Sequence, residues 1–481
     1  MRKAILTALV LGVVSVVFVM FGCRITPPPD VIIENQWPRI YLVNVPPDSS
    51  QLPHAPIVYW YGADPDGYII AYQWAIDDTS TWNTLWVDSG MGTEDTIAFA
   101  APLPDTEFTH IFYVRAMDND TDVTISDSIG RRVFRVTNIP PVNTVIEEGP
   151  EDSTTLFVIS DTIATWYGIY FKWSTEDSDE VFLPKFSWKW DGGAWSEWDE
   201  AREKYFTGND DPALRTTGWH AFFLRAMDDA MAIDSSCAPR AIYVSVPTLS
   251  KRLLVIDETS DRLSNPSPSL PSDAMVDSFY ALILDNAGWG GYESIDNSDE
   301  SAVIPHDTIG QYRIVLLHTD DWNVPSLPEA SILEEYLDVG GRLLIGGYQA
   351  LSSLTSGFQD GHLGVDSLVA TTGNDFISAF PQFAGFDTLL VDAAKNIFNP
   401  GIPNVQVCFI KNIPKDALYG YHSVSGDSAM EGRPVMFQFE HESGEFRAAA
   451  ASFPLYRIEV DGSTGEPLAT TIKNILDWLN E

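Results

Sequence analysis

Acidic and histidine side chains follow two strand-like segments in the second half of the chain. Asp257 and Glu258 close the apolar run RLLVID, and His318, Asp320 and Asp321 close YRIVLLH. If both runs are parallel strands of one sheet, their carboxyl ends meet at one rim, where we expect these groups to converge. A neutral imidazole beside carboxylates binds a divalent metal or acts as general base and acid. The competing interpretation is that these acidic residues are ordinary loop and helix-cap residues.

The elements that would position this rim alternate between strands and amphipathic helices from Lys251 to Glu481. Apolar residues from Met275 to Ile283 recur on one helical face, which predicts a helix after the first strand. Ser326 and Glu329 have the spacing of a capping box and predict the start of another helix. The alternation predicts an α/β domain over residues 251–481.

The stretch GGRLLIGGYQAL, residues 340–351, predicts the end of that helix, a strand, a tight glycine turn and a further helix. Many α/β enzymes hold their nucleophile at such a turn. Here the turn Gly346–Gln349 contains neither Ser nor Cys, and Cys408 lies in the apolar run VQVCFI, so it is not expected to replace the missing thiol. The candidates for ligand binding at this rim are Glu258, Asp321, Tyr348 and Gln349.

The segments LLVID, FYALILDNAG, YRIVLLHTDD, EEYLDVGGRLLIGG and FPLY with ILDWL give this region a family resemblance. It resembles the class I glutamine amidotransferase-like superfamily, in the non-amidotransferase branch that includes trehalose-utilisation-type proteins. The resemblance implies a flavodoxin-like, doubly wound sheet with any site at the carboxyl ends of its strands. Catalytic members have a Cys at the glycine turn and a His-Pro-Glu element near the C-terminus, where this chain has SFPLYRIE. Amidotransferase chemistry is therefore not expected.

The first half of the chain contains an internal repeat. HIFYVRAMDND, beginning at His110, recurs as HAFFLRAMDDA, beginning at His220, and the upstream WAID recurs as WKWD. Polar and apolar residues alternate along these segments, as in half-buried strands. The repeat predicts two all-β modules, residues 36–139 and 140–248, which resemble fibronectin type III and related immunoglobulin-like domains.

Two further features of the modules suggest ligands. Asp64 and Asp66 in ADPDG offer the oxygen ligands that Ca²⁺ prefers, although Pro65 and Gly67 explain the same segment as a turn. Ca²⁺ is the one cofactor that the sequence suggests. Tryptophans outside the regular Trp strand are candidates for sugar stacking. They are Trp82, Trp86, Trp195 and Trp198.

The N-terminus, MRKAILTALVLGVVSVVFVMFGC, has the basic start and apolar run of a secretory signal. A transmembrane anchor competes with this interpretation because of the length of the apolar run. The ending MFGC resembles the bacterial lipobox, with Met20 and Phe21 departing from its usual residues, which implies removal of residues 1–22 and acylation of Cys23. Residues 23–35, with three consecutive prolines, then predict an extended stalk. By resemblance to the sorting rule for lipoproteins, Arg24 favours the outer membrane or cell surface over the inner membrane.

The net charge of -40, from 28 basic and 68 acidic residues, excludes nucleic acid as an expected partner, because phosphate binding needs clustered Lys and Arg. The expected partners are membrane lipid, through acylated Cys23, and a glycan or a cell-envelope protein. Cys237 and Cys408 fall in different predicted domains; a disulfide between them is possible in an oxidising compartment, but each is expected to be a small buried apolar side chain.

These features predict a multidomain lipoprotein of the bacterial cell envelope, with two all-β immunoglobulin-like sandwiches followed by an α/β flavodoxin-like domain. The missing nucleophile favours a non-catalytic protein for ligand binding, adhesion or display. The alternative is a hydrolase that acts on glycans through Asp257, His318 and Asp320, with or without a metal.

Overall fold

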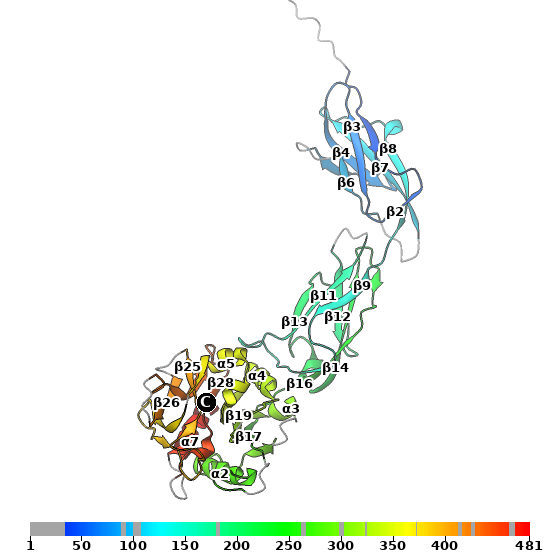
Figure 1. Cartoon of the computed structure of the whole chain (residues 1–481). Helices are drawn as coiled ribbons and strands as arrows, with labels where there is room; N and C mark the ends of the chain where they lie inside the picture. Colours follow the sequence, from blue (N-terminus) through cyan, green and yellow to red (C-terminus); the bar gives the residue numbers. More distant parts are fainter. Residues whose placement is uncertain are drawn as a thin grey trace, which may run out of the picture. The chain divides into compact units, whose positions relative to one another are not determined.

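The computed structural model describes residues 34–87, 93–99, 107–178, 183–260, 266–297, 303–322, 325–371, 373–411, 416–424, 429–460 and 467–481. The chain divides into two compact units. Figure 1 labels the helices and strands of both. One is Met1–Ile139 with two short loop segments from further along the chain, and the other contains the remainder. The predicted signal and Cys23 lie outside the described residues, so the anchor stays a prediction. Within the described ranges, no helix is both long and apolar enough to cross a membrane.

The first unit is an all-β sandwich of two sheets. Its smaller sheet has the order β1-β3-β6 (Arg39–Val43, Ile57–Ala63, Glu94–Thr96). The larger sheet has the order β2-β8-β7-β4-β5 (Ser50–Pro53, Gly130–Thr137, Phe108–Asp118, Ile69–Ile76, Asn83–Trp86). Alternate residues of β7 are buried, beginning at His110, as the sequence pattern predicted. Trp60, Phe112 and Phe134 lie in the core between the sheets.

The second sandwich has the same architecture. One sheet has the order β13-β11-β9 (Glu203–Phe206, Ile169–Glu176, Val142–Glu148). The other has the order β10-β16-β14-β12 (Thr154–Phe157, Arg240–Ser245, Gly218–Met227, Lys185–Trp190), with β15 (Ile233–Asp234) beside β14. Its aromatic core includes Trp173, Trp190 and Phe222. The chain therefore contains the two all-β sandwiches that the repeat predicted.

The repeat extends to individual contacts, because each sandwich has the same aspartate and histidine contact. Asp77 contacts the ring Nδ1 of His110 at 2.7 Å and accepts the backbone N–H of the residue after it at 2.8 Å. Asp191 contacts His220 at 2.8 Å and accepts the equivalent N–H at 2.8 Å. Both aspartates have left-handed backbone, with φ of 59° and 48°. The two modules are thus alike in local geometry as well as in sequence.

Residues 251–481 form an α/β domain around one large sheet. Five parallel strands have the order β18-β17-β19-β20-β28 (Glu293–Asp296, Lys251–Asp257, Tyr312–Thr319, Arg342–Gly347, Arg447–Ala451). Antiparallel strands continue it in the order β27-β26-β22-β23 (Pro434–Glu440, Ala417–Ser423, Asn374–Pro381, Leu389–Leu390), with β24 (Ile402–Pro403) beside β22. A separate pair is formed by β21 (Val365–Ala370) and β25 (Gln406–Ile410).

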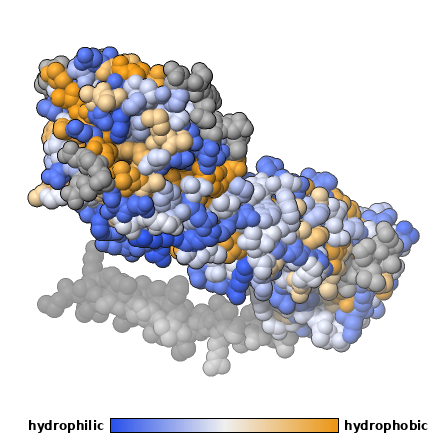
Figure 2. Space-filling model, turned by 90° about the horizontal axis from the view of Figure 1, so that it is seen from below, coloured by the Kyte–Doolittle hydropathy of each residue, from blue (hydrophilic) through white to orange (hydrophobic). Residues whose placement is uncertain are grey.

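Helices cover both faces of this sheet. Alternate strand residues point to opposite sides, and here the residues on both sides are apolar and need to be covered. Leu253 and Val255 pack in the cluster that contains residues of α2 (Asp273–Asn286) and α7 (Leu468–Asn480). Leu254 and Ile256 pack in a second cluster with residues of α3 (His306–Ile309), α4 (Ala330–Asp338) and α5 (Ser356–Leu363). On the face seen in Figure 2, hydrophilic residues cover much of the surface, in keeping with the excess of acidic residues.

Two local predictions differ from the structure. Helix α4 begins at Ala330, and its N-cap residue is Glu329, which has helical backbone angles and makes no side-chain capping hydrogen bond, so the predicted capping box with Ser326 is wrong. Glu329 is fully buried and its carboxyl interacts with Glu258 instead. After β20 the chain enters a short 3₁₀ turn, Ala350–Ser353, and the α-helix begins only at Ser356.

Candidate functional site

The structure brings together the three side chains that were candidates for catalysis. Strands β17 and β19 are adjacent and parallel, with Asp257 opposite His318 in the register. The Nδ1 atom of His318 lies 3.4 Å from Asp257 Oδ1 and 3.2 Å from Asp320 Oδ2. The predicted rim at the carboxyl ends of these strands therefore exists, and the imidazole lies between two carboxylates.

This set is closed to solvent. His318, Asp257 and Asp320 are 1%, 2% and 0% exposed. The ring of Tyr280 stacks on the imidazole with centroids 3.6 Å apart, and its hydroxyl donates to Asp320 at 3.0 Å. The backbone N–H of Tyr456 donates to the other oxygen of Asp320 at 2.9 Å. His318 and Asp320 are thus shielded from solvent among the described residues, which is the arrangement of a buried structural ion group.

Charge balance in this group favours the protonated imidazole. Burial by itself lowers the pKa of His318, but Asp257, Asp320 and Asp277 together outweigh burial and raise that pKa above its usual range. A charged histidine between carboxylates stabilises the rim electrostatically. The same charges disfavour the neutral general base that the sequence suggested, which stays an untested alternative.

The ligand-binding candidates are also placed at this rim, with unequal access. Glu258 is buried and accepts a hydrogen bond from the side chain of Asn297. Asp321 is half-buried and accepts the backbone N–H of Ser260 at 3.0 Å. Tyr348 is buried, and its hydroxyl accepts from Asn404 at 3.3 Å. Of the four candidates, Gln349 and Asp321 are the ones that reach the surface in part.

The glycine turn keeps strained geometry without a nucleophile. Gln349, directly after the buried Tyr348, has φ of 57° and ψ of 19°, a left-handed conformation that costs energy for a non-glycine residue. Its amide is no nucleophile. Cys408 is fully buried, and burial raises its thiol pKa far above the usual range, so the thiol stays protonated and inert. Cys237 and Cys408 are both free cysteines; Cys408 is buried, as predicted, whereas Cys237 is only half-buried.

A buried arginine lies beside the rim, in the segment SFPLYRIE. Arg457, in SFPLYRIE, is buried, and its guanidinium donates to the backbone carbonyls of Ser269, Lys395 and Asp320. It also lies 4.4 Å from the ring centroid of Trp322. These contacts join three loops to the rim, which is a structural role.

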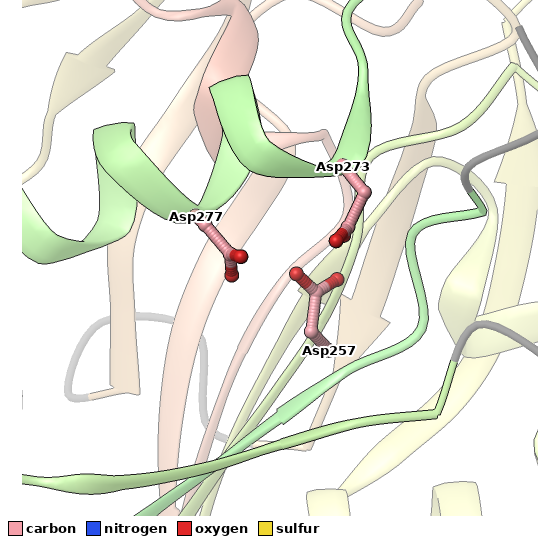
Figure 3. A group of neighbouring side chains, drawn as sticks. All are labelled: Asp257, Asp273 and Asp277. Carbon is pink, nitrogen blue, oxygen red and sulfur yellow. The ribbon is translucent and has the colours of Figure 1, made fainter.

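The structure also reveals acidic residues that the sequence analysis missed. Asp273 and Asp277, one helical turn apart at the start of α2, point toward Asp257 (Figure 3). One oxygen from each of the three carboxylates lies within 4.8 Å of the others. The four-residue spacing in DAMVD was the available signal, because it places both aspartates on one side of a helix.

These carboxylates repel one another. Burial, together with Asp257, Asp277 and Asp296, raises the pKa of Asp273 to about 7. Burial and Asp257 raise the pKa of Asp277 as well, although nearby His318 acts in the opposite direction. A bound proton or a bound cation would reduce the repulsion between these carboxylates.

The two module features have local explanations. Asp66 accepts the backbone N–H of Gln36, and Asp64 accepts that of Asp66 at 3.5 Å. In the described part of the chain, neither aspartate belongs to a group of three acidic, His or Cys side chains close enough to share a metal. The contact between Asp64 and Asp66 fits the predicted turn, and the Ca²⁺ interpretation of ADPDG stays a prediction.

Arginine side chains stack on the rings of three of the four candidate tryptophans. Arg115 lies 4.1 Å from the ring centroid of Trp82, and Arg225 lies 4.1 Å from Trp195 and 4.6 Å from Trp198. Trp86 is 61% exposed. One face of each of the first three rings is thus used for cation–π packing rather than left for a sugar.

Comparison with known proteins gives no family. No family model matches the chain, and no curated protein matches it. Fibronectin(III)-like modules of Clostridium thermocellum CbhA match with 11% identity and a TM-score of 0.18, over 43% of this chain and 93% of that one. Chicken CNTN1 FN1–FN3 domains match with 11% identity and a TM-score of 0.18, over 45% and 69%. A β-galactosidase from Rahnella sp. R3 matches with 14% identity and a TM-score of 0.27, over 47% and 31%.

Proposed function

We propose that this protein is a lipid-anchored, extracytoplasmic protein of a bacterial cell envelope that binds or displays a ligand without catalysis. In this proposal Cys23 is acylated and residues 23–35 form a stalk. Two immunoglobulin-like sandwiches then precede an α/β binding domain. The ligand would be a glycan or a cell-envelope protein, and the anionic surface argues against nucleic acid.

One observation supports binding over catalysis. His318, with Asp257 and Asp320, is sealed at 0–2% exposure, so its convergence with the carboxylates produces no accessible acid–base pair. That convergence is also what favours the alternative, a glycan hydrolase acting through the same three residues. The burial of all three weighs against it, because a general acid or base must reach its substrate directly or through one water.

The strand order supports the finer fold assignment. Five parallel strands in the order β18-β17-β19-β20-β28, with helices on both faces, fit a flavodoxin-like, doubly wound domain. Within it, a glycine turn with Gln349 in left-handed backbone fits a degenerate amidotransferase-like elbow. Fold likeness alone does not identify the ligand.

The anchor is tested by metabolic labelling with a radioactive fatty acid in a bacterial host. Wild-type protein should be labelled and should fractionate with membranes, whereas Cys23→Ala should lose the label and accumulate as precursor. Cys237→Ala is the matched control and should be labelled normally. Undiminished labelling of Cys23→Ala would refute lipidation at this residue.

The absence of catalysis is tested with a panel of glycans. The purified full chain should bind to immobilised glycans on an array, and no hydrolysis products should appear in solution. Sustained turnover by the wild type that disappears in His318→Ala would favour the hydrolase and refute the non-catalytic role.

A further inference from the structure

The cluster of Asp257, Asp273 and Asp277 contains a buried oxygen without a donor. Asp257 is 2% exposed, and its Oδ1 accepts the backbone N–H of Thr259 at 2.7 Å. Its Oδ2 is buried and has no hydrogen-bond donor outside the cluster; the side chains that it meets are the carboxyl groups of Asp273 and Asp277. Figure 3 shows this carboxylate directed at those of Asp273 and Asp277. A buried carboxylate oxygen is normally paired, so this one indicates a missing positive partner.

The charges around the cluster are mainly negative. Asp296 adds a fourth acidic group that acts on both helix residues, and His318 is the positive group that acts on Asp277. The imidazole of His318 is already shared between Asp257 and Asp320. One imidazolium therefore does not balance the carboxylates around it.

The ligand atoms are all oxygens, the donors that hard divalent cations prefer. No two of the three oxygens are more than 4.8 Å apart. Two oxygens bound to one Ca²⁺ at 2.3–2.6 Å can be separated by up to about 5 Å, so one ion can reach all three. Mg²⁺ is usually held by only one or two carboxylates and keeps several waters, so three protein carboxylates favour Ca²⁺. The group includes no His or Cys atom, which disfavours zinc.

We propose that Asp257, Asp273 and Asp277 form a binding site for a hard divalent cation, and that this cation is Ca²⁺. Asp257 is held rigidly at the end of β17, and the two helix residues lie on one side of α2. Asp277 is exposed and Asp273 is half-buried, so the outer side of the site is open to water. Water molecules can complete the coordination there. The bound ion would join the start of α2 to the end of β17.

The site stands apart from the proposed anchor and binding role, since it uses neither Cys23 nor the turn at Gln349. It also differs from the ADPDG segment, which is in the other unit of the chain. The helix N-terminus is not the basis of the proposal, because the buried oxygen that lacks a donor belongs to a strand residue.

The test is isothermal titration calorimetry of the full chain in detergent, after treatment with a chelator. Ca²⁺ is added from about 1 μM to about 10 mM, a range that covers sensor and extracellular calcium sites. The wild type should show saturable binding. Asp277→Asn, which changes an exposed ligand and should not disturb folding, should weaken Ca²⁺ affinity roughly 10- to 100-fold, the loss seen even for residues behind metal ligands.

Asp285→Asn is the matched control, because Asp285 is an exposed aspartate of the same helix and its loss changes the charge equally. Its affinity for Ca²⁺ should equal that of the wild type. Circular dichroism checks that each variant is folded. No saturable binding by the wild type, or equal binding by Asp277→Asn and the wild type, would overturn the site. Tighter binding of Mg²⁺ than of Ca²⁺ in a parallel titration would overturn the assignment to Ca²⁺.

Discussion

At the scale of single residues, the group of His318, Asp257 and Asp320 is almost fully buried in the α/β domain. Removing two carboxylates and an imidazolium from water is costly unless their geometry is good and their remaining polar atoms are paired. Here Asp320 receives hydrogen bonds from Tyr280 and Tyr456 on its two oxygens, and Tyr280 covers the imidazole face. Loss of one partner should therefore cost more than an ordinary hydrogen bond.

We predict that Tyr280→Phe destabilises the α/β domain by about 1.5–3 kcal/mol, the range for hydrogen bonds to charged groups. The phenyl ring preserves the stacking on His318, so the loss isolates the hydroxyl. Tyr419→Phe is the comparison, because the hydroxyl of Tyr419 meets the neutral partners Thr471 and Asp387 carbonyl, and should cost about 1 kcal/mol. Urea denaturation measures both values. A smaller loss for Tyr280→Phe than for Tyr419→Phe would contradict the charged acceptor.

The pKa of Asp273, about 7 in the folded protein against 3.8 for an isolated aspartate, predicts a pH effect in chelator-treated protein. Between these values the folded state holds a proton that the unfolded chain has released, so stability falls as pH rises. The raised pKa of His318 acts in the same direction, since its stabilisation is complete below pH about 6.5 and is lost as pH rises through its folded pKa.

Asp273→Asn should therefore lose less thermal stability than the wild type when the pH is raised from about 4.5 to about 7.5, because Asn carries no proton to release. Asp285→Asn removes the same charge from the same helix and should follow the wild type. The melting temperature of each protein in chelator, at both pH values, measures the effect. Parallel curves for Asp273→Asn and the wild type would show that Asp273 is ionised normally.

At the scale of elements, each sandwich is closed by an aspartate in left-handed backbone. Asp191 follows β12. Its carboxylate accepts hydrogen bonds from the ring of His220 and from the backbone N–H of Ala221, both in β14. The conformation costs energy for a residue with a Cβ, and the short polar side chain offsets that cost through local hydrogen bonds. The same solution occurs at Asp77 in the first sandwich.

We predict that Asp191→Ala destabilises the second sandwich by about 2–4 kcal/mol, since it removes two hydrogen bonds and leaves Ala in left-handed backbone. Glu197→Ala, at an exposed position shortly after this turn, should change stability by less than about 0.5 kcal/mol. Amide hydrogen exchange in β12 and β14 reports the loss locally. Unchanged protection of these strands in Asp191→Ala would show that the contact is dispensable.

At the scale of the whole molecule, the chain divides into two compact units with separate cores. The first sandwich packs around Trp60 and Phe112, whereas α7 packs its apolar face into the core of the α/β domain. Since these cores share no residue in the described ranges, a defect in one should leave the other intact.

We predict that differential scanning calorimetry of the full chain resolves at least two transitions. Asp77→Ala should lower the melting temperature of one transition. Leu476→Ala, which leaves a cavity in the core at α7, should reduce the stability of the α/β domain by about 2–5 kcal/mol and so lower the melting temperature of another transition. Asn474→Ala, on the exposed side of α7, should change neither. A single transition that shifts in all variants would show that the units unfold cooperatively.

Much of the fold could be predicted from the sequence because periodicity and repetition are local properties. Alternation in HIFYVRAMD gave the buried face of β7, and its recurrence gave the second sandwich. Apolar strands separated by amphipathic helices gave the α/β pattern after Lys251, and the rim at Asp257 and His318 followed from strands being parallel and adjacent. These inferences need only the order of residues along the chain.

Only the tertiary structure decided what those residues can do. The sequence placed His318 at a strand end, but the ring of Tyr280 and the backbone of Tyr456 close it from solvent, and those contacts come from distant elements. The packing angle of α2 brings Asp273 and Asp277 to Asp257, which no local pattern specifies. Residue order determined which side chains could meet, and three-dimensional packing determined their exposure and charge, because burial and Coulomb interactions depend on distances through space.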